Sequence, residues 1–349
     1  MATDTRPLLS RVADSLYWMA RYMERAENVA RLLEVNLNLQ LDLPLDGNQW
    51  QPVIDTCGES ALFRKQYGEA TQESVVAFLA QDREYSNSIT SCLFAARENA
   101  RSVRETISSE TWEHVNGIYL RVLKEYAKPP EDLSPEVFRD LRLAGHMFQG
   151  ITDATMSHNE AWHFVRLGRQ MERADKTSRL LDVKYFMLLP SATGVGTPYD
   201  DLLWSAVLKS ASAFEMYRQC CGKISPREVV NFLVLDPDFP RSIRHSVDRA
   251  ADSLDVIREG SVCDSVRLLT ELRQELDEMD VDEMIQSGLH EFLDNLQTRL
   301  NTVGAGLQRD FFALRVQTQK RTQSQSQSQG GQSQSQSQSQ TQTQSVGGE

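Results

Sequence analysis

The chain has few cysteines, and they lack the spacing of a metal site or a disulfide framework. There are five, an odd number, and none belongs to a Cys-x-x-Cys motif: Cys57, Cys92, Cys220, Cys221 and Cys263. Unpaired thiols are typical of reducing compartments, and a structural zinc site needs clustered cysteine or histidine ligands. The cysteines therefore predict a cytoplasmic protein without a structural zinc.

Long apolar runs are also missing, and so is an excess of positive charge. No segment is long enough to span a bilayer, and residues 1–7 lack the basic-then-apolar pattern of a signal peptide. The chain holds 49 Asp and Glu against 37 Lys and Arg, a net charge of −12. Because such a charge repels nucleic-acid phosphates, we expect no nucleic acid among its partners. Because no segment is long enough to span a bilayer, we expect no membrane either.

Familiar catalytic and metal-binding motifs are absent. No glycine-rich phosphate loop precedes a helix, and no Gly-x-Ser-x-Gly is present. His158 and His163 are five residues apart, which places them about 140° apart around a helix, so they cannot share a metal ion. Residues 158–160 are more typical of the cap of a following helix. The residues predict no metal site and no cofactor.

Alternating β patterns are missing as well, and β-branched residues are sparse, so we predict an all-α fold. At 349 residues with 40% hydrophobic content, the chain can bury a sizeable core. Periodicity, caps and breakers predict helices over residues 10–41, 50–57, 59–67, 71–80, 87–107, 109–127, 135–155, 159–188, 199–221, 226–233, 241–258, 261–279 and 284–316.

Breaks in this pattern suggest a division of the chain. Proline and glycine residues at 190–198 form the clearest linker. They separate an N-terminal helical part, 8–190, from a C-terminal helical part, 198–316. The remainder, 317–349, is largely alternating Gln and Ser with almost no apolar residue, and we expect a disordered tail there.

Fifteen residues of the first predicted helix recur 148 residues later. Residues 21–35 and 169–183 align without a gap, with nine identical positions and two exchanges of Glu for Asp. Each copy has an apolar stripe at helical spacing, and Leu32 and Leu180 lie on the opposite, charged side. A helix that is apolar nearly all round is buried. The pseudo-repeat indicates two duplicated helical halves, or two central helices packed with approximate twofold symmetry.

The charged residues of these buried helices are the candidate site. A third segment adds to them, because Arg97, Arg101 and Arg104 lie on one helix face beside Glu98. Since an isolated buried charge is very costly, these groups must pair with one another or bind a ligand. The candidates are Arg21, Glu24, Arg25, Asn28, Arg97, Glu98, Arg101, Arg169, Glu172 and Arg173.

Three interpretations of the charges remain open. Glu24 with Arg173, and Glu172 with Arg25, would form bidentate pairs between the two repeat helices and fix their register. Six arginines against three glutamates would suit a ligand carboxylate or phosphate. In the third interpretation, Glu24 or Glu172 has a raised pKa and is a general base.

Five segments of the chain form a pattern known from one protein family. They are residues 10–19, 23–27, 96–101, Trp162 with 168–175, and 239–242. With these segments the chain resembles the bacterial alpha-E domain family, α-helical proteins with a Glu-Arg motif. The resemblance covers about residues 8 to 315, in order.

This resemblance implies a helical partner for circularly permuted ATP-grasp ligases and transglutaminase-like peptidases. The chain has no such segment of its own, so the enzyme would be a separate protein. We expect a non-catalytic accessory protein that binds the ligase or presents its substrate. The alternatives are an enzyme or small-anion-binding protein that uses the Arg/Glu cluster on an anionic molecule or peptide, and a scaffold without a ligand. The oligomeric state, a homo-oligomer included, stays open.

Overall fold

The structure, a computed structural model, describes residues 8–42, 50–188, 198–261 and 263–313. These residues form fourteen α-helices, with short 3-10 and π turns, and none of them lies in a β-strand, which confirms the all-α prediction. The predicted linker and the predicted Gln/Ser tail lie outside the described residues, apart from Pro198.

The helices follow one another in two series of seven. The first series is α1 (Ser10–Asp42), α2 (Gln51–Cys57), α3 (Ser60–Tyr67), α4 (Gln72–Val76) continued by the π turn η1 (Ala77–Gln81), α5 (Ile89–Ser102), α6 (Ser109–Glu125), η2 (Pro130–Asp132) and α7 (Pro135–Thr155). The second series is α8 (Glu160–Leu188), α9 (Pro198–Ser210), α10 (Phe214–Cys221), α11 (Pro226–Leu235), α12 (Ile243–Ile257), α13 (Asp264–Glu278), α14 (Val281–Leu307) and η3 (Gln308–Phe312).

The two series correspond at several positions. α1 and α8 carry the fifteen-residue repeat, and the fourth helices share a second motif, Val-Val-x-Phe-Leu, at 75–79 and 229–233. Each series therefore begins with one copy of the repeat, and the two copies, α1 and α8, pack against each other. The second repeat helix begins the second series, whereas the division predicted from the linker grouped both repeat helices in 8–190.

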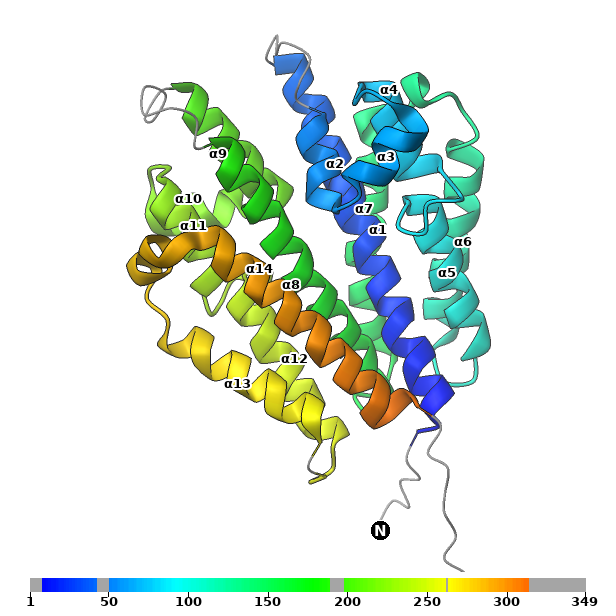
Figure 1. The fold of residues 1–349 in the computed structure, drawn as a ribbon. Helices are drawn as coiled ribbons and strands as arrows, with labels where there is room; N and C mark the ends of the chain where they lie inside the picture. Colours follow the sequence, from blue (N-terminus) through cyan, green and yellow to red (C-terminus); the bar gives the residue numbers. More distant parts are fainter. Residues whose placement is uncertain (1–7, 43–49, 189–197, 262, 314–349) are drawn as a thin grey trace, which may run out of the picture. The chain divides into compact units, whose positions relative to one another are not determined.

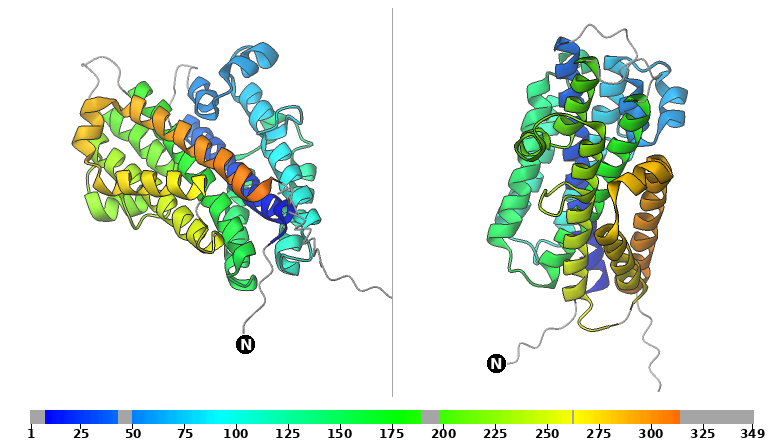
Figure 2. Two further views of the ribbon diagram at one scale, coloured as in Figure 1. Left: turned by 60° about the horizontal axis from the view of Figure 1, so that its bottom comes forward. Right: turned by 90° about the vertical axis from the view of Figure 1, so that its left-hand side faces the viewer.

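α1 and α8 run side by side in the same direction (Figure 1). Their N-terminal ends meet where the backbone amide of Leu8 donates to Glu160, and ion pairs join them further along. α5 and α7 pack on α1, and α12 packs on α8 (Figure 2). The described residues up to Ala313 belong to one compact unit with α1 and α8 at its centre.

A glycine permits the close approach of the two central helices. A Cβ atom added to Gly168 of α8 would stand 2.3 Å from the carbonyl oxygen of Tyr17 in α1. Because that neighbour is backbone, it has little freedom to move aside. The register of the ion pairs therefore depends on a residue without a side chain at this position.

Apolar stripes bury both central helices, as predicted. In α1 the stripe residues are all at most 3% exposed: Leu16, Met19, Met23, Ala26, Ala30 and Leu33. Phe164 and Leu181 of α8 are equally buried, and Leu32 and Leu180 on the charged sides are only 6% exposed. No helix within the described ranges is long and apolar enough to cross a membrane.

Some helix boundaries differ from the prediction. The helix predicted over 199–221 is two helices, because Ser212 adopts a left-handed backbone (φ 51°) and Ala213 donates back to the carbonyl of Leu208. The last helix begins at Val281 and is kinked at Gly288, whose φ is 107°. α5 is shorter than predicted and begins after Ser88, whose side chain caps it. Local backbone conformation and capping hydrogen bonds set these helix ends, and hydrophobic periodicity does not predict them.

Candidate functional site

The first half of the charge network centres on Glu172, whose side chain is fully buried. Arg25 of α1 binds both of its oxygens, with Nε 2.6 Å from Oε1 and Nη2 2.9 Å from Oε2. Arg21 donates from Nε to Oε2 at 2.8 Å, and the Lys176 ammonium lies 3.6 Å from Oε1. Lys176 also contacts Asp175 at 3.0 Å. One buried carboxylate thus binds three cations from two helices.

The second half centres on Glu24 and mirrors the first. Arg173 of α8 binds it with Nε 2.9 Å from Oε1 and Nη2 3.0 Å from Oε2. Arg241, which precedes α12, bridges Glu24 at 2.9 Å and Glu27 at 3.0 Å. Glu27 also accepts from the buried Arg31. The predicted cross-pairs between the repeat helices are therefore both confirmed.

These contacts keep the buried carboxylates ionised. Burial alone would raise the pKa of Glu24, but Arg173 and Arg241 outweigh it and lower that pKa to about 2. Burial likewise opposes ionisation of Glu172, and Arg25 and Arg21 nevertheless hold its pKa well below the ordinary value. A carboxylate that is ionised but bound so strongly is a weak proton acceptor at neutral pH.

Asn28 and Arg169 are the other predicted residues of the two central helices. The Asn28 amide donates to the backbone carbonyl of Glu24 at 2.7 Å. Arg169 is 5% exposed, and its nearest carboxylate, Asp153, is 4.0 Å away. Burial, with Arg173 nearby, lowers the pKa of Arg169 to about 10. Arg169 therefore lies beside the network without joining its carboxylates.

Arg97, Glu98 and Arg101 lie elsewhere, contrary to the prediction that they join the central charges. Arg97 donates to Asn116 of α6 at 2.7 Å and to Glu98, and Arg101 also binds Glu98. The Arg101 side chain is 62% exposed. The spacing of these residues correctly places them on a helix face, but that face turns toward α6 and solvent and away from α8.

Several residues of the network were not predicted. They are Glu27, Arg31, Asp175, Lys176, Arg179 and Arg241. A signal existed for most of them, because Glu27 and Asp175 are a Glu/Asp exchange in the repeat and Arg31 and Arg179 are identical positions. Arg241 lies in one of the segments that carry the family resemblance.

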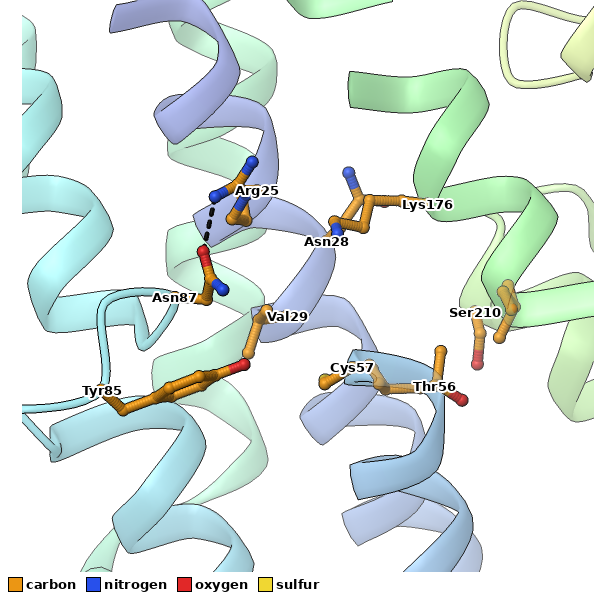
Figure 3. A pocket seen from close by; sticks show the side chains of 11 residues that line it. Arg25, Asn28, Val29, Thr56, Cys57, Tyr85, Asn87, Lys176 and Ser210 are labelled. Carbon is orange, nitrogen blue, oxygen red and sulfur yellow. Dashed lines mark hydrogen bonds between the residues drawn. The ribbon is translucent and has the colours of Figure 1, made fainter. Parts of the chain in front are cut away.

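A cavity adjoins the network between the two central helices. Its volume is about 530 Å³, open solvent at its mouth included. α1, α2, α8, the end of α9 and the loop before α5 line it: Arg25, Asn28, Val29, Leu32, Thr56, Cys57, Tyr85, Asn87, Lys176, Leu180 and Ser210. Figure 3 shows Arg25 of α1 and Lys176 of α8 on facing helices, with the hydrogen bond from Arg25 to Asn87. Cationic and apolar groups thus share one space.

The thiols near this cavity are not activated. Burial raises the pKa of Cys57 to about 11 and that of Cys92 to about 12, so both are protonated at neutral pH. All five cysteines are unpaired. In the described part of the chain, no three His, Cys, Asp or Glu residues are grouped so that they could hold a metal ion. His158 instead contacts the backbone carbonyl of Asp153, and Asn159 caps α8.

Comparison with known proteins agrees with this architecture. Residues 8–312 match the Alpha-E family, described as a predicted alpha-helical domain with a conserved ER motif. Uncharacterized proteins of Mycobacterium bovis and Mycobacterium tuberculosis are 24–25% identical over 335 residues. The match covers 87% of this chain but only 37% of the length of those relatives. No solved structure matches the chain significantly.

Proposed function

The chain belongs to the Alpha-E family, and from that premise we propose that it is a non-catalytic, all-helical accessory protein of a peptide-ligating or peptide-modifying system. Its partner is a separate ATP-grasp ligase or transglutaminase-like protein, as the family resemblance implies. The five unpaired cysteines are consistent with a function in the reducing cytoplasm.

The charge network supports a structural role for the Glu-Arg motif over a catalytic one. Glu24 and Glu172 each bind a guanidinium through both oxygens, and their lowered pKa values suit permanent anions. Catalytic bases and acids need a pKa near the working pH. The motif therefore serves to hold α1 against α8 in one register, and the surfaces of the outer helices are left for recognition.

The observation that carries the proposal is a groove between α6 and α7. Leu143 and Met147 of α7 line it and are 49% and 58% exposed. Further along, Ile118 and Leu141 form its floor. Exposed large apolar side chains gathered in a groove are typical of a protein interaction site.

Charge specifies the kind of partner surface that the groove fits. Five carboxylates line it: Glu110, Glu113, Glu125, Glu136 and Asp140. The basic residues are Arg121 and His114, and burial lowers the pKa of His114 even though it contacts the carbonyl of Ala144. An apolar floor with an acidic rim is complementary to a basic amphipathic helix, and we assign such a helix of the partner enzyme to it.

The lengths of the relatives agree with an accessory role. The matched region is 37% of each mycobacterial relative, so most of each relative lies outside it. In those proteins the helical region is thus one part of a larger polypeptide. A helical unit that acts together with another protein is consistent with that arrangement.

Binding to a purified partner tests the proposal. The chain is mixed with an ATP-grasp ligase encoded in the same genome, and the complex is measured by light scattering and biolayer interferometry. We expect a saturable complex that the double variant Leu143→Asp/Met147→Asp weakens at least about tenfold, because two apolar contacts are lost and two repelling charges are added.

Val256→Asp provides the matched control. Val256 is 50% exposed on α12, so the same change of chemistry is made away from the groove, and the affinity should stay as in the wild type. If neither an ATP-grasp nor a transglutaminase-like protein of that genome forms a complex, or if Val256→Asp weakens it as much as the groove variant, the assignment is wrong.

A further inference from the structure

Two loops of the chain have the same hydrogen-bonding pattern, one in each series. Asp82 accepts from the amides two and three residues ahead, at 2.7 and 3.2 Å, and Asp236 does the same at 2.9 and 2.7 Å. The capping residues Ser88 and Ser242 donate back to the carbonyls of those aspartates. The residues just before the two capping serines, Asn87 and Arg241, therefore occupy equivalent positions in the two loops.

Asn87 and Arg241 differ in how much space they fill. The Arg241 guanidinium reaches the buried carboxylates of Glu24 and Glu27 and is itself only 7% exposed. Asn87 is shorter, and its side-chain oxygen accepts a hydrogen bond from Arg25. The cavity lies beside Asn87. The first series thus has an opening beside Asn87, whereas in the second series the Arg241 side chain fills the equivalent position.

The charges around this opening do not balance. Within the ion pairs beside it, the four cations Arg21, Arg25, Lys176 and Arg179 share two carboxylates, Glu172 and Asp175, so these pairs have an excess of two positive charges. One excess charge belongs to Arg21, which is directed away, 4.9 Å from the Trp18 ring. The other remains on the side of the cavity, whose charged lining residues are Arg25 and Lys176, while the carboxylates of Asp55 and Glu59 act on Cys57 from outside the lining.

We propose that this cavity binds a small molecule through a single carboxylate, held by Lys176 and Arg25. The excess of one positive charge matches a monoanion, whereas a phosphate group carries nearly two negative charges at neutral pH.

The remaining walls define the body of the ligand. Val29, Leu32 and Leu180 are apolar, so the carboxylate is attached to an apolar group of a few carbon atoms. The Asn87 amide and the Tyr85 hydroxyl lie on the wall nearest Arg25 and suit an amide next to the carboxylate. N-acyl amino acids and the C-terminal residues of peptides have this combination. Cys57 remains a protonated thiol, so the site binds without forming a covalent bond.

Isothermal titration calorimetry with N-acetyl-leucine, on the full chain, tests the site directly. N-acetyl-leucinamide has the same shape without the charge and is the ligand control. We expect saturable binding of the acid and at least tenfold weaker binding of the amide. Free leucine and the peptide Ala-Ala-Leu are two further probes. Higher affinity for leucine would identify a free amino acid as the ligand, and higher affinity for the peptide would identify a chain terminus.

Two variants locate the binding. Asn87→Arg should abolish it, because the new guanidinium fills the opening as Arg241 fills its counterpart. Lys176→Gln should weaken it at least tenfold and remains informative if Asn87→Arg does not fold. Lys128→Gln is the control, since it removes a lysine from an exposed pair with Glu125 in the segment after α6.

Four outcomes would overturn the proposal. Three concern the ligand: an absence of binding by all three carboxylate probes, equal binding of the acid and its amide, and competition by inorganic phosphate at equal concentration. The fourth is wild-type affinity in Lys176→Gln. The test is independent of the proposed partner, because Leu143→Asp/Met147→Asp should leave the binding of N-acetyl-leucine unchanged.

Discussion

Replacing Glu172 by glutamine should destabilise the chain more than the loss of any surface charge. The side chain is fully buried and accepts from Arg21 at one oxygen and from Arg25 at both, with Lys176 3.6 Å away. Glutamine has nearly the same shape but no charge, and its amide nitrogen would face a guanidinium donor. Removing one partner of a buried ion pair typically costs about 3–5 kcal/mol, and here three cations lose their common counterion.

The measurement is equilibrium urea unfolding, followed by circular dichroism and extrapolated to zero denaturant. Glu228→Gln is the matched control, because Glu228 pairs with Arg227 at the surface and is 37% exposed. Exposed pairs contribute roughly 0–1 kcal/mol, so the two glutamine variants should differ by at least about 2 kcal/mol.

A small effect would refute the reasoning. If Glu172→Gln unfolds within about 1 kcal/mol of the wild type, the network is not what holds α1 to α8. Unchanged stability together with loss of ligand or partner binding would instead assign the Glu-Arg motif to recognition, which is the interpretation that the paired geometry argues against.

Two further predictions concern the same helices. Gly168→Ala should lower the free energy of unfolding by about 1–3 kcal/mol, because the new methyl group would stand 2.3 Å from the Tyr17 carbonyl oxygen. Gly117→Ala is the control, since a methyl group there meets nothing within 4 Å and should be neutral or stabilising. Both variants are measured by urea unfolding. The lowered pKa of Glu24 stabilises the folded state at pH values above its ordinary pKa of 4.5, and this contribution is lost as the pH falls toward about 2. The difference in unfolding free energy between wild type and Glu24→Gln should therefore shrink over that range, and a difference independent of pH would show that Glu24 is not strongly paired.

The central part of the fold could be predicted because its signals lie within single helices. Apolar stripes with further apolar residues on the opposite side indicate burial, and charges repeated at the same helix positions indicate that buried charges meet one another. Since both copies contain Glu followed by Arg, the pairing of Glu24 with Arg173 and of Glu172 with Arg25 follows from packing the two copies together.

What could not be predicted depends on neighbours far apart in the chain. Arg241 enters the network from a loop more than 200 residues from Glu24, and nothing in its local sequence specifies that direction. The spacing of Arg97 and Arg101 defines a face, but not which helix covers it. The division of α9 from α10 depends on a left-handed serine, a conformation for which glycine is the usual signal.

The reciprocal pairing of the central helices also bears on how such a chain can arise. Glu24 pairs only with arginines of the other series, and Arg25 and Arg173 each bind a glutamate of the other series, so neither series is electrically complete alone. A seven-helix ancestor encoded once would meet the same complement in a second molecule of itself, with Glu24 of one subunit against Arg25 of its twin. Fusion of two such genes would join that symmetric pair into one polypeptide, and afterwards the two copies would be free to diverge, one keeping an opening where the other acquired an arginine.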